Sequence, residues 1–257
     1  MHRARKRFGQ HFLHDGSVIE RILRAIDPQP GDNLLEIGPG RGALTYPLLR
    51  RCGRLTVVEL DRDLAPLLAR EAEGLGELEV INADILKFDL ASIAKDKNFR
   101  LVGNLPYNIS TPLMFHLLES AQLIEDMHFM VQKEVAQRIV AAAGDGSYGR
   151  LSVMLQSRCR CHYLFDVAPT CFKPPPKVDS AVIRLQPLAQ AAADLGEAEN
   201  FSKIVQAAFN QRRKTIANSL KSILDRETII NCGIDPAWRA ENLEIADFVK
   251  LSRALDS

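Results

Sequence analysis

The first feature of the sequence that could take part in ligand binding or catalysis is a glycine-rich turn within residues 34–43. The stretch reads LLEIGPGRGA, in which an apolar strand runs into Gly38, Pro39 and Gly40 and a helical pattern follows. Glycines let the backbone pass close to a ligand because no Cβ stands in the way. The stretch also satisfies GxGxxA, so a dinucleotide-binding turn and a tight turn without a ligand are both open at this point.

Two acids follow at the ends of the next two predicted strands. Glu59, followed by Leu60, stands about where nucleotide-binding folds place an acid that accepts from ribose hydroxyls. Asp84, followed by Ile85, can accept from an adenine amine, although a single Asp of this kind is more often a turn cap. Ligands of open α/β sheets bind at the carboxyl ends of the strands. The series resembles class I S-adenosylmethionine-dependent methyltransferases and predicts cofactor contacts at Gly38, Gly40, Glu59, Leu60, Asp84 and Ile85.

The run Asn104-Leu105-Pro106-Tyr107 ends the fourth predicted strand. It resembles the catalytic loop of methyltransferases that modify amino groups conjugated to planar rings or carbonyls. The exocyclic amine of adenine is a poor nucleophile because its lone pair is delocalised into the ring. A site for it must therefore position the nitrogen and favour the cationic form that develops on transfer. We expect the Asn104 oxygen and the Leu105 carbonyl to accept the amine hydrogens, Pro106 to fix the backbone and Tyr107 to stack on the base.

A second aromatic side chain stands at the start of a proline-rich segment, Phe172-Lys173-Pro174-Pro175-Pro176-Lys177-Val178. Consecutive prolines stiffen the backbone. Enzymes that act on a nucleobase hold it between aromatic or apolar side chains. We therefore expect Phe172 to form the opposite wall of an adenine slot, and the alternative is that Phe172 lies in the core.

Cations are segregated along a chain whose net charge is only +1. The first 13 residues contain no acid, and Ser202–Arg226 contains one acid, Asp225, among clustered Lys and Arg. Such clusters favour a surface that faces phosphates, and the alternative is a solvated charged face. The predicted RNA-binding residues are Arg5, Lys6, Arg7, Arg212, Arg213, Lys214 and Lys221.

Alternating strand and helix patterns position these residues. Helical stretches separate five apolar runs, which favours a mostly parallel, doubly wound sheet of the Rossmann type. The predicted strands are 33–37, 54–60, 77–82, 99–104 and 126–132, with an antiparallel pair at 162–167 and 180–186. The predicted helices are 43–51, 62–73, 112–120 and 133–142, followed beyond a linker by 201–209, 214–224 and 246–255. We expect a catalytic domain at residues 1–187 and a small helical domain at 188–257.

The composition of the 257 residues, 46% hydrophobic and 25% charged, is that of an ordinary globular protein. No apolar run approaches the roughly 20 residues that span a membrane, and no secretory signal is visible. The five cysteines contain no CxxC pair, which favours a reduced, cytoplasmic protein. Cys159, Cys161, His162 and Cys171 have poor spacing for zinc, so we expect no metal.

The motifs together are similar to those of the universal ribosomal RNA adenine dimethyltransferase family, most of all to its bacterial members that act on small-subunit (16S) RNA. The resemblance covers nearly the full length. It rests on the motifs RFGQHFL, EIGPGRGALT, NADIL, GNLPYNIST, QKEVAQR, FKPPPKVDSAV and NQRRKT.

That resemblance implies a Rossmann-like catalytic domain with a helical C-terminal domain, and cofactor contacts at His11, Leu13, Gly38, Glu59, Asp84 and Asn104. Asparagine often stands in the family where this chain has His11. The resemblance also implies dimethylation of two adjacent adenosines near the 3′ end of 16S RNA, and we expect a monomer that acts on a pre-30S particle.

Three other functions remain open at this point: a methyltransferase for large-subunit RNA, a non-catalytic ribosome-assembly factor on the same fold, and a nicotinamide oxidoreductase. The C-terminal helical segment and the wording FKPPPKVDSAV favour the small-subunit enzyme over the large-subunit one. The intact NLPY run and the acids favour an active enzyme over an assembly factor.

Overall fold

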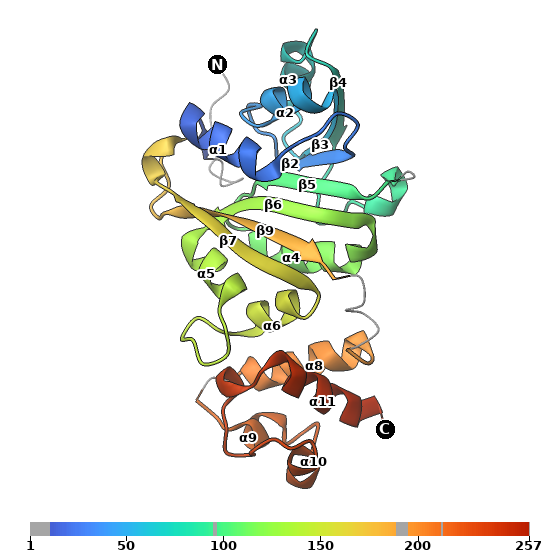
Figure 1. Ribbon diagram of the computed structural model, residues 1–257, viewed down its shortest axis with the longest axis vertical. Helices are drawn as coiled ribbons and strands as arrows, with labels where there is room; N and C mark the ends of the chain where they lie inside the picture. The colour runs from blue at the N-terminus through green and yellow to red at the C-terminus, as the bar shows by residue number, and fades with distance from the viewer. Residues whose placement is uncertain (1–10, 95–96, 189–194, 212, 257) are drawn as a thin grey trace. The chain divides into compact units, whose positions relative to one another are not determined.

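The computed structural model describes residues 11–94, 97–188, 195–211 and 213–256 (Figure 1). The chain forms two compact units, one of Met1–Ala136 and His162–Pro187 and the other of Gln137–Cys161 and Leu188–Ser257. The chain passes into the second unit for the last time at Leu188. Residues 137–161 also belong to the second unit, which differs from the predicted division.

The first unit is built on a seven-stranded sheet of order β4-β3-β2-β5-β6-β9-β7. Neighbours among β4, β3, β2, β5 and β6 are parallel, and β9 runs antiparallel to β6. The predicted mostly parallel α/β sheet is therefore confirmed. The strands are β2 (Leu34–Ile37), β3 (Arg54–Glu59), β4 (Glu77–Asn82), β5 (Phe99–Asn104), β6 (Ile124–Gln132), β7 (Cys159–Val167) and β9 (Ser180–Pro187). A small separate pair joins β1 (Phe12–Leu13) to β8 (Phe172–Lys173).

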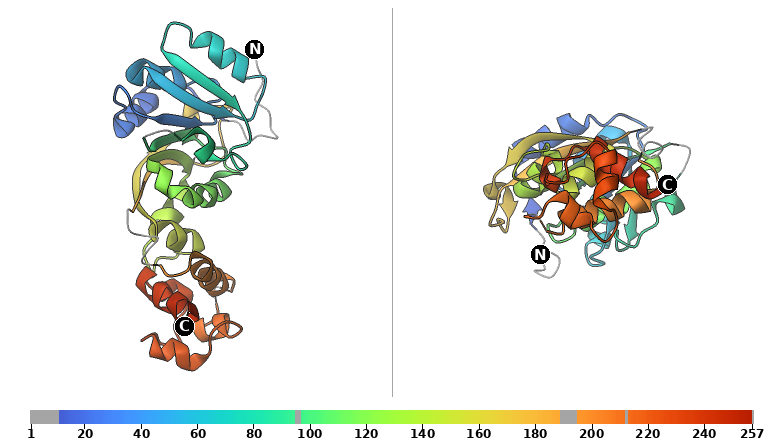
Figure 2. Two further views of the ribbon diagram at one scale, coloured as in Figure 1. Left: turned by 90° about the vertical axis from the view of Figure 1, so that its right-hand side faces the viewer. Right: turned by 90° about the horizontal axis from the view of Figure 1, so that it is seen from below.

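Helices cover both faces of this sheet, with α1 on the near face and α4 on the far face in Figure 1; Figure 2 gives two further views. They are α1 (Gly16–Ile26), α2 (Thr45–Cys52), α3 (Ala65–Glu71), α4 (Ser110–Glu119) and α5 (Lys133–Val140), with 3₁₀ turns at Leu90–Ile93, Ala121–Leu123 and Pro169–Cys171. Strands buried on both faces read as continuous apolar runs, and all four residues of β2 are buried. Because β2, β3, β4 and β5 run parallel, their carboxyl ends lie at the same edge of the sheet.

The helix α1 was not among the predicted helices. Its start is capped by Asp15, whose carboxylate accepts from the backbone N–H groups of Ser17 and Val18. Ile22, Leu23 and Ile26 on one face of α1 are buried in the same core cluster as residues of α2, β2 and β3. The helix thus covers the sheet next to the segment that contains His11.

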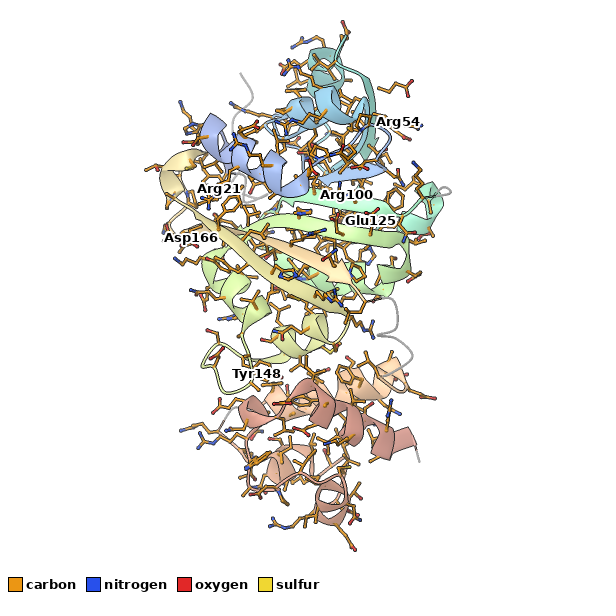
Figure 3. All side chains as sticks on the ribbon, in the orientation of Figure 1. Arg21, Arg54, Arg100, Glu125, Tyr148 and Asp166 are labelled. Atoms are coloured by element: carbon orange, nitrogen blue, oxygen red, sulfur yellow. The ribbon has the colours of Figure 1, made fainter. Side chains whose placement is uncertain are left out.

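A buried ionic network fastens three strands of the sheet. Arg100 on β5, labelled in Figure 3, donates from Nε to Asp126 Oδ1 of β6 at 3.0 Å and from Nη1 to Asp32 Oδ2 at 2.7 Å. Arg184 on β9 donates from Nη2 to Asp126 Oδ2 at 3.0 Å. Asp126 is 1% exposed, and removing one member of such a network would leave a buried charge uncompensated.

The second unit is helical. It contains α6 (Arg150–Gln156), α8 (Ala198–Phe209), α9 (Ile216–Leu220), α10 (Arg226–Asn231) and α11 (Ile245–Asp256), with a 3₁₀ turn at Ala240–Asn242. Tyr148, labelled in Figure 3, packs its ring edge-on against Phe209 at 6.0 Å, and Phe209 stacks on Phe248 at 5.7 Å. These aromatic contacts explain why the segment around Tyr148 joins the C-terminal helices.

No helix in the described part of the chain is both long enough and apolar enough to cross a membrane.

Candidate functional site

A cavity of about 350 Å³ opens at the carboxyl ends of β2, β3 and β5 in the first unit. The residues that line it come from the glycine-rich turn, from the ends of the strands and from the segment that contains β1. They are His11, Phe12, Leu13, Glu36, Ile37, Gly38, Pro39, Gly40, Arg41, Ala43, Leu44, Val58, Glu59, Leu60, Ala83, Asp84, Ile85, Leu86, Asn104, Leu105, Pro106, Tyr107, Asn108 and Ile109. The predicted cofactor residues and the NLPY run therefore lie around one cavity.

The glycine-rich turn forms one wall of the cavity and is tied to Glu59. The backbone N–H of Gly40 donates to Glu59 Oε2 at 3.1 Å, and that of Asp61 donates to Glu59 Oε1 at 2.8 Å. Gly40 has a φ of 57°, and a Cβ there would lie 3.2 Å from the ring of Phe12. Burial raises the pKa of Glu59, although the two backbone donors oppose this shift. The acid thus holds the turn and still faces the cavity.

Glu36 is a site residue that the motif analysis did not single out. It is 2% exposed, lines the cavity and accepts from the Thr45 hydroxyl at 2.6 Å. Burial, with the nearby Glu59 adding to it, raises the pKa of Glu36 to about 8 although the Thr45 hydroxyl opposes the shift. An acid inside the apolar strand LLEI was the signal for this residue, because a buried carboxyl needs a functional or structural partner.

Replacing Glu36 with Gln is expected to remove a pH dependence of stability. The pKa of Glu36 is about 8 in the folded protein, whereas Glu in an unfolded chain titrates near about 4.3. The folded state therefore binds the proton more tightly, and the free energy of unfolding falls as pH rises from about 4.3 to about 8. Gln has no proton to lose, so the Tm of Glu36→Gln minus that of the unchanged protein should increase over this range. A difference that is constant with pH would contradict a protonated Glu36.

Three of the predicted cofactor residues, Leu60, Asp84 and Ile85, follow the ends of β3 and β4. All three line the cavity. Asp84 Oδ1 accepts from the backbone N–H of Leu86 at 3.1 Å, so this carboxylate also caps its own turn. The Leu60 side chain is 51% exposed.

The amide of Asn104 is oriented by the segment that contains β1. Its Nδ2 donates to the backbone carbonyl of His11 at 3.0 Å. Because Nδ2 is turned to this carbonyl, Oδ1 is the acceptor end of the amide that this bond does not use. Asn104 lines the cavity. The N–H of Leu105 donates to the carbonyl of Met130 on β6 at 3.1 Å. This bond attaches the start of the NLPY run to the neighbouring strand.

Tyr107 is held at its ring and at its hydroxyl. The rings of Tyr107 and His11 stack with centroids 5.7 Å apart and planes 27° apart. The Tyr107 hydroxyl hydrogen-bonds the Ser180 hydroxyl at 2.7 Å, and burial raises the pKa of Tyr107. The sequence analysis did not single out Ser180, which is fully buried at the start of β9. Tyr107 faces the cavity as predicted, with His11 already against it.

Phe172 lies in the core of the first unit. It is 2% exposed and belongs to the hydrophobic core cluster together with Leu13, its antiparallel partner in the β1–β8 pair. It is not among the residues that line the cavity. The structure thus places Phe172 in the core beside Leu13, which is the alternative left open by the sequence, and a second wall of an adenine slot stays a prediction for this residue.

The pair of β1 with β8 brings His11 and Leu13 to the cavity. His14 donates its backbone N–H to the Cys171 carbonyl at 3.0 Å, and His11 Nδ1 lies 2.8 Å from the Pro174 carbonyl. A carbonyl only accepts, so Nδ1 is the donor in this hydrogen bond.

Of the predicted RNA-binding residues, the second unit presents Arg213, Lys214 and Lys221 as exposed side chains. Lys214 and Lys221 line a polar hollow of about 210 Å³ together with Ala207, Asn210, Gln211, Asn218, Ser219 and Ser222. Arg5, Lys6, Arg7 and Arg212 lie outside the described residues.

Comparison with known proteins decides the family. The family model described as Ribosomal RNA adenine dimethylase matches residues 1–257. The chain belongs to this family. A Ribosomal RNA small subunit methyltransferase A from Methylococcus capsulatus is 54% identical over 255 residues, which cover 99% of each chain. The protein of the same name from Pseudomonas aeruginosa is also 54% identical, over 99% of this chain and 95% of its own.

Solved structures agree with this assignment. A dimethyladenosine transferase from Plasmodium falciparum superposes with a TM-score of 0.79 at 27% identity, covering 94% of this chain and 96% of its own. The 23S rRNA methyltransferase ErmE has a TM-score of 0.74 at 29% identity, covering 96% of this chain and 100% of its own. The predicted class I methyltransferase fold and the family resemblance are both confirmed.

The cavity suits the cofactor of such dimethylases. Methyltransferases of this family use S-adenosylmethionine. The turn at Gly38 and Gly40 leaves room for a ligand close to the backbone, and carboxylates at Glu59 and Asp84 supply acceptors for hydroxyl and amine hydrogens. These acceptors therefore fit the nucleoside part of S-adenosylmethionine.

Proposed function

We propose that the chain transfers methyl groups from S-adenosylmethionine to N6 of two adjacent adenosines near the 3′ end of 16S ribosomal RNA. The observation that carries this proposal is the match over 99% of the chain, at 54% identity, to small-subunit methyltransferases. An intact NLPY run on the rim of the cavity supports an active enzyme.

One set of residues binds the cofactor, and another positions the adenine base. Gly38, Gly40, Glu59 and Asp84 hold the cofactor, whose sulfonium supplies an electrophilic methyl group when bound. Asn104 Nδ2 is fixed on the His11 carbonyl. Asn104 Oδ1 accepts a hydrogen bond from the adenine amine and stabilises the positive charge that develops on the nitrogen. The methylated ammonium is acidic and releases its proton readily, so no dedicated base is required. The main contribution is positioning and electrostatics.

Tyr107 and Ser180 are expected to act as one unit in holding the base. Their hydroxyls are 2.7 Å apart, and a neutral hydrogen bond contributes about 1 kcal/mol. Tyr107→Phe and Ser180→Ala should each lower kcat for methyl transfer about 3- to 10-fold, and the double variant should lose little more than either single one. Multiplied losses in the double variant would show that the two hydroxyls act separately. Ser157→Ala, which removes a buried hydroxyl outside the cavity, is the control.

Transfer of labelled methyl groups tests the function. The acceptors are unmodified small subunits, naked 16S RNA and large subunits, and the products are analysed as nucleosides. Dimethyladenosine confined to small-subunit RNA is the expected result. Transfer to large-subunit RNA alone would favour the activity named for ErmE, and cofactor binding without transfer to any acceptor would favour an assembly factor.

The substrate is proposed to be a pre-30S particle rather than naked RNA, and the enzyme is proposed to act as a monomer in the cytoplasm during ribosome biogenesis. The predicted cations are separated along the chain, at residues 5–7 and 212–221, and contacts with phosphates would position a substrate without specifying its sequence. Faster transfer to the particle than to naked RNA would support this choice.

A further inference from the structure

The second unit carries an exposed aromatic side chain that the proposed function does not use. Trp238 is the only tryptophan of the sequence. It is 46% exposed and is followed by Arg239, whose side chain is 52% exposed. A tryptophan usually buries most of its large apolar surface, so an exposed one needs a reason.

The backbone of Trp238 is fixed beside the basic segment that precedes α9. Its carbonyl accepts from the N–H of Ile216 at 2.6 Å, and its own N–H donates to the Asp235 carbonyl at 3.0 Å. Thr215 and Arg239 form an antiparallel bridge next to this bond. The ring therefore stands on an ordered backbone, and binding a flat partner would cost little conformational entropy there.

The same segment provides cations and a hollow for an anion. Arg213 and Lys214 are exposed, and Lys214 and Lys221 line the polar hollow with amides and hydroxyls. None of the lining residues that the structure describes is acidic. The hydroxyl oxygen of Ser219 in this lining is buried and has no hydrogen-bond partner among the described residues.

Two acids also lie near Trp238, and both are engaged. The Asp235 carboxylate accepts from the N–H of Ala237 at 2.8 Å. Glu241 lies 3.9 Å from the guanidinium of Arg239. Four cations, Arg213, Lys214, Lys221 and Arg239, stand against these two acids, so the net charge is four minus two, or +2. This favours a polyanion over an apolar protein surface as the partner.

We infer that Trp238 stacks on an unpaired base of ribosomal RNA while a phosphate of the same strand occupies the hollow between Lys214 and Lys221. The inference rests on the proposed function for its choice of RNA. Single-stranded RNA is recognised in this way, through bases stacked on aromatic rings and a backbone that follows cations. Double-stranded RNA does not offer a free base face, so the site selects unpaired nucleotides.

The single tryptophan makes the contact directly measurable, because RNA contains no tryptophan and all tryptophan fluorescence comes from Trp238. The protein is titrated with a single-stranded oligoribonucleotide, with its duplex, and with an oligomer of the same length that lacks bases. Strong quenching by the single strand, with weak quenching by the duplex and the abasic oligomer, is the expected result. Equal quenching by all three, or RNA binding without any quenching, would overturn the stacking contact.

Substitutions of Trp238 measure how much the stacking contact contributes to RNA affinity. Trp238→Ala should weaken binding of the single strand about 5- to 150-fold, and Trp238→Phe should restore most of the affinity. Ile230→Ala removes another exposed apolar side chain of the second unit, 52% exposed, and should leave the affinity unchanged. Unchanged RNA affinity of Trp238→Ala would reject the proposal and leave the exposed ring to a protein partner.

Measurements on the unchanged protein separate this proposal from the proposed function. S-adenosylmethionine binding should be the same in Trp238→Ala, since Trp238 is not among the residues that line the cofactor cavity. Failure of the unchanged protein to methylate small subunits would reject the proposed function, whereas quenching by single-stranded RNA would still establish the stacking contact.

Discussion

Replacing Asn104 with Ala is expected to lower kcat for methyl transfer by at least about 100-fold while RNA binding is retained. The variant removes the oxygen that is proposed to accept from the adenine amine and the Nδ2 group that donates to the His11 carbonyl. Preorganised acceptors of this kind favour the developing charge more than the ground state, so the loss falls on kcat rather than on RNA affinity. Single-turnover transfer to small subunits, with RNA binding measured in parallel, checks this.

Asn33→Ala is a matched control for Asn104→Ala. Asn33 also donates its side-chain amide to a backbone carbonyl, that of Lys97 at 2.9 Å, and does not line the cavity. Its kcat should equal that of the unchanged protein. Full turnover in Asn104→Ala would remove Asn104 from the mechanism, and an equal loss in Asn33→Ala would point to a general effect on the fold.

Replacing Glu59 with Ala is expected to raise the Kd for S-adenosylmethionine by at least about 100-fold. Glu59 is the expected acceptor for the ribose hydroxyls, and its two oxygens also hold the N–H groups of Gly40 and Asp61. The variant therefore loses a ligand contact and the anchor of the glycine-rich turn together. Isothermal titration with S-adenosylhomocysteine measures the effect.

Glu79→Ala on the adjacent strand β4 is the control for Glu59→Ala. Glu79 accepts from the Thr56 hydroxyl at 3.3 Å and does not line the cavity. Its Kd should stay within about twofold of the unchanged value, and melting curves of both variants show whether they are folded. A folded Glu59→Ala protein with unchanged affinity would exclude Glu59 from the cofactor site.

The sheet and most of the cofactor cavity were predictable from local patterns. Apolar runs bounded by turns predict β2, β3, β4 and β5, and the rule that ligands bind at the carboxyl ends of strands places Glu59, Asp84 and Asn104 at one edge of the sheet. The rule works because parallel strands bring residues that are distant in sequence to the same edge.

Features that depend on contacts between distant segments could not be predicted from the sequence. Phe172 is buried beside Leu13 because β8 pairs with β1, and no local pattern encodes that register. The grouping of residues 137–161 with the C-terminal helices depends on Tyr148 packing against Phe209. Ser180 gains its place in the site only because β9 pairs with β6 beside the NLPY run.

The hydrogen bond from Asn104 to His11 ends on a backbone carbonyl rather than on a side chain. Every amino acid carries that carbonyl, so the residue type at position 11 can change without disturbing the orientation of the catalytic amide. The orientation of Asn104 therefore places no constraint on the side chain at position 11: exchange of His11 would alter what stacks on Tyr107 and what lines the cavity, while the hydrogen bond to Asn104 is kept.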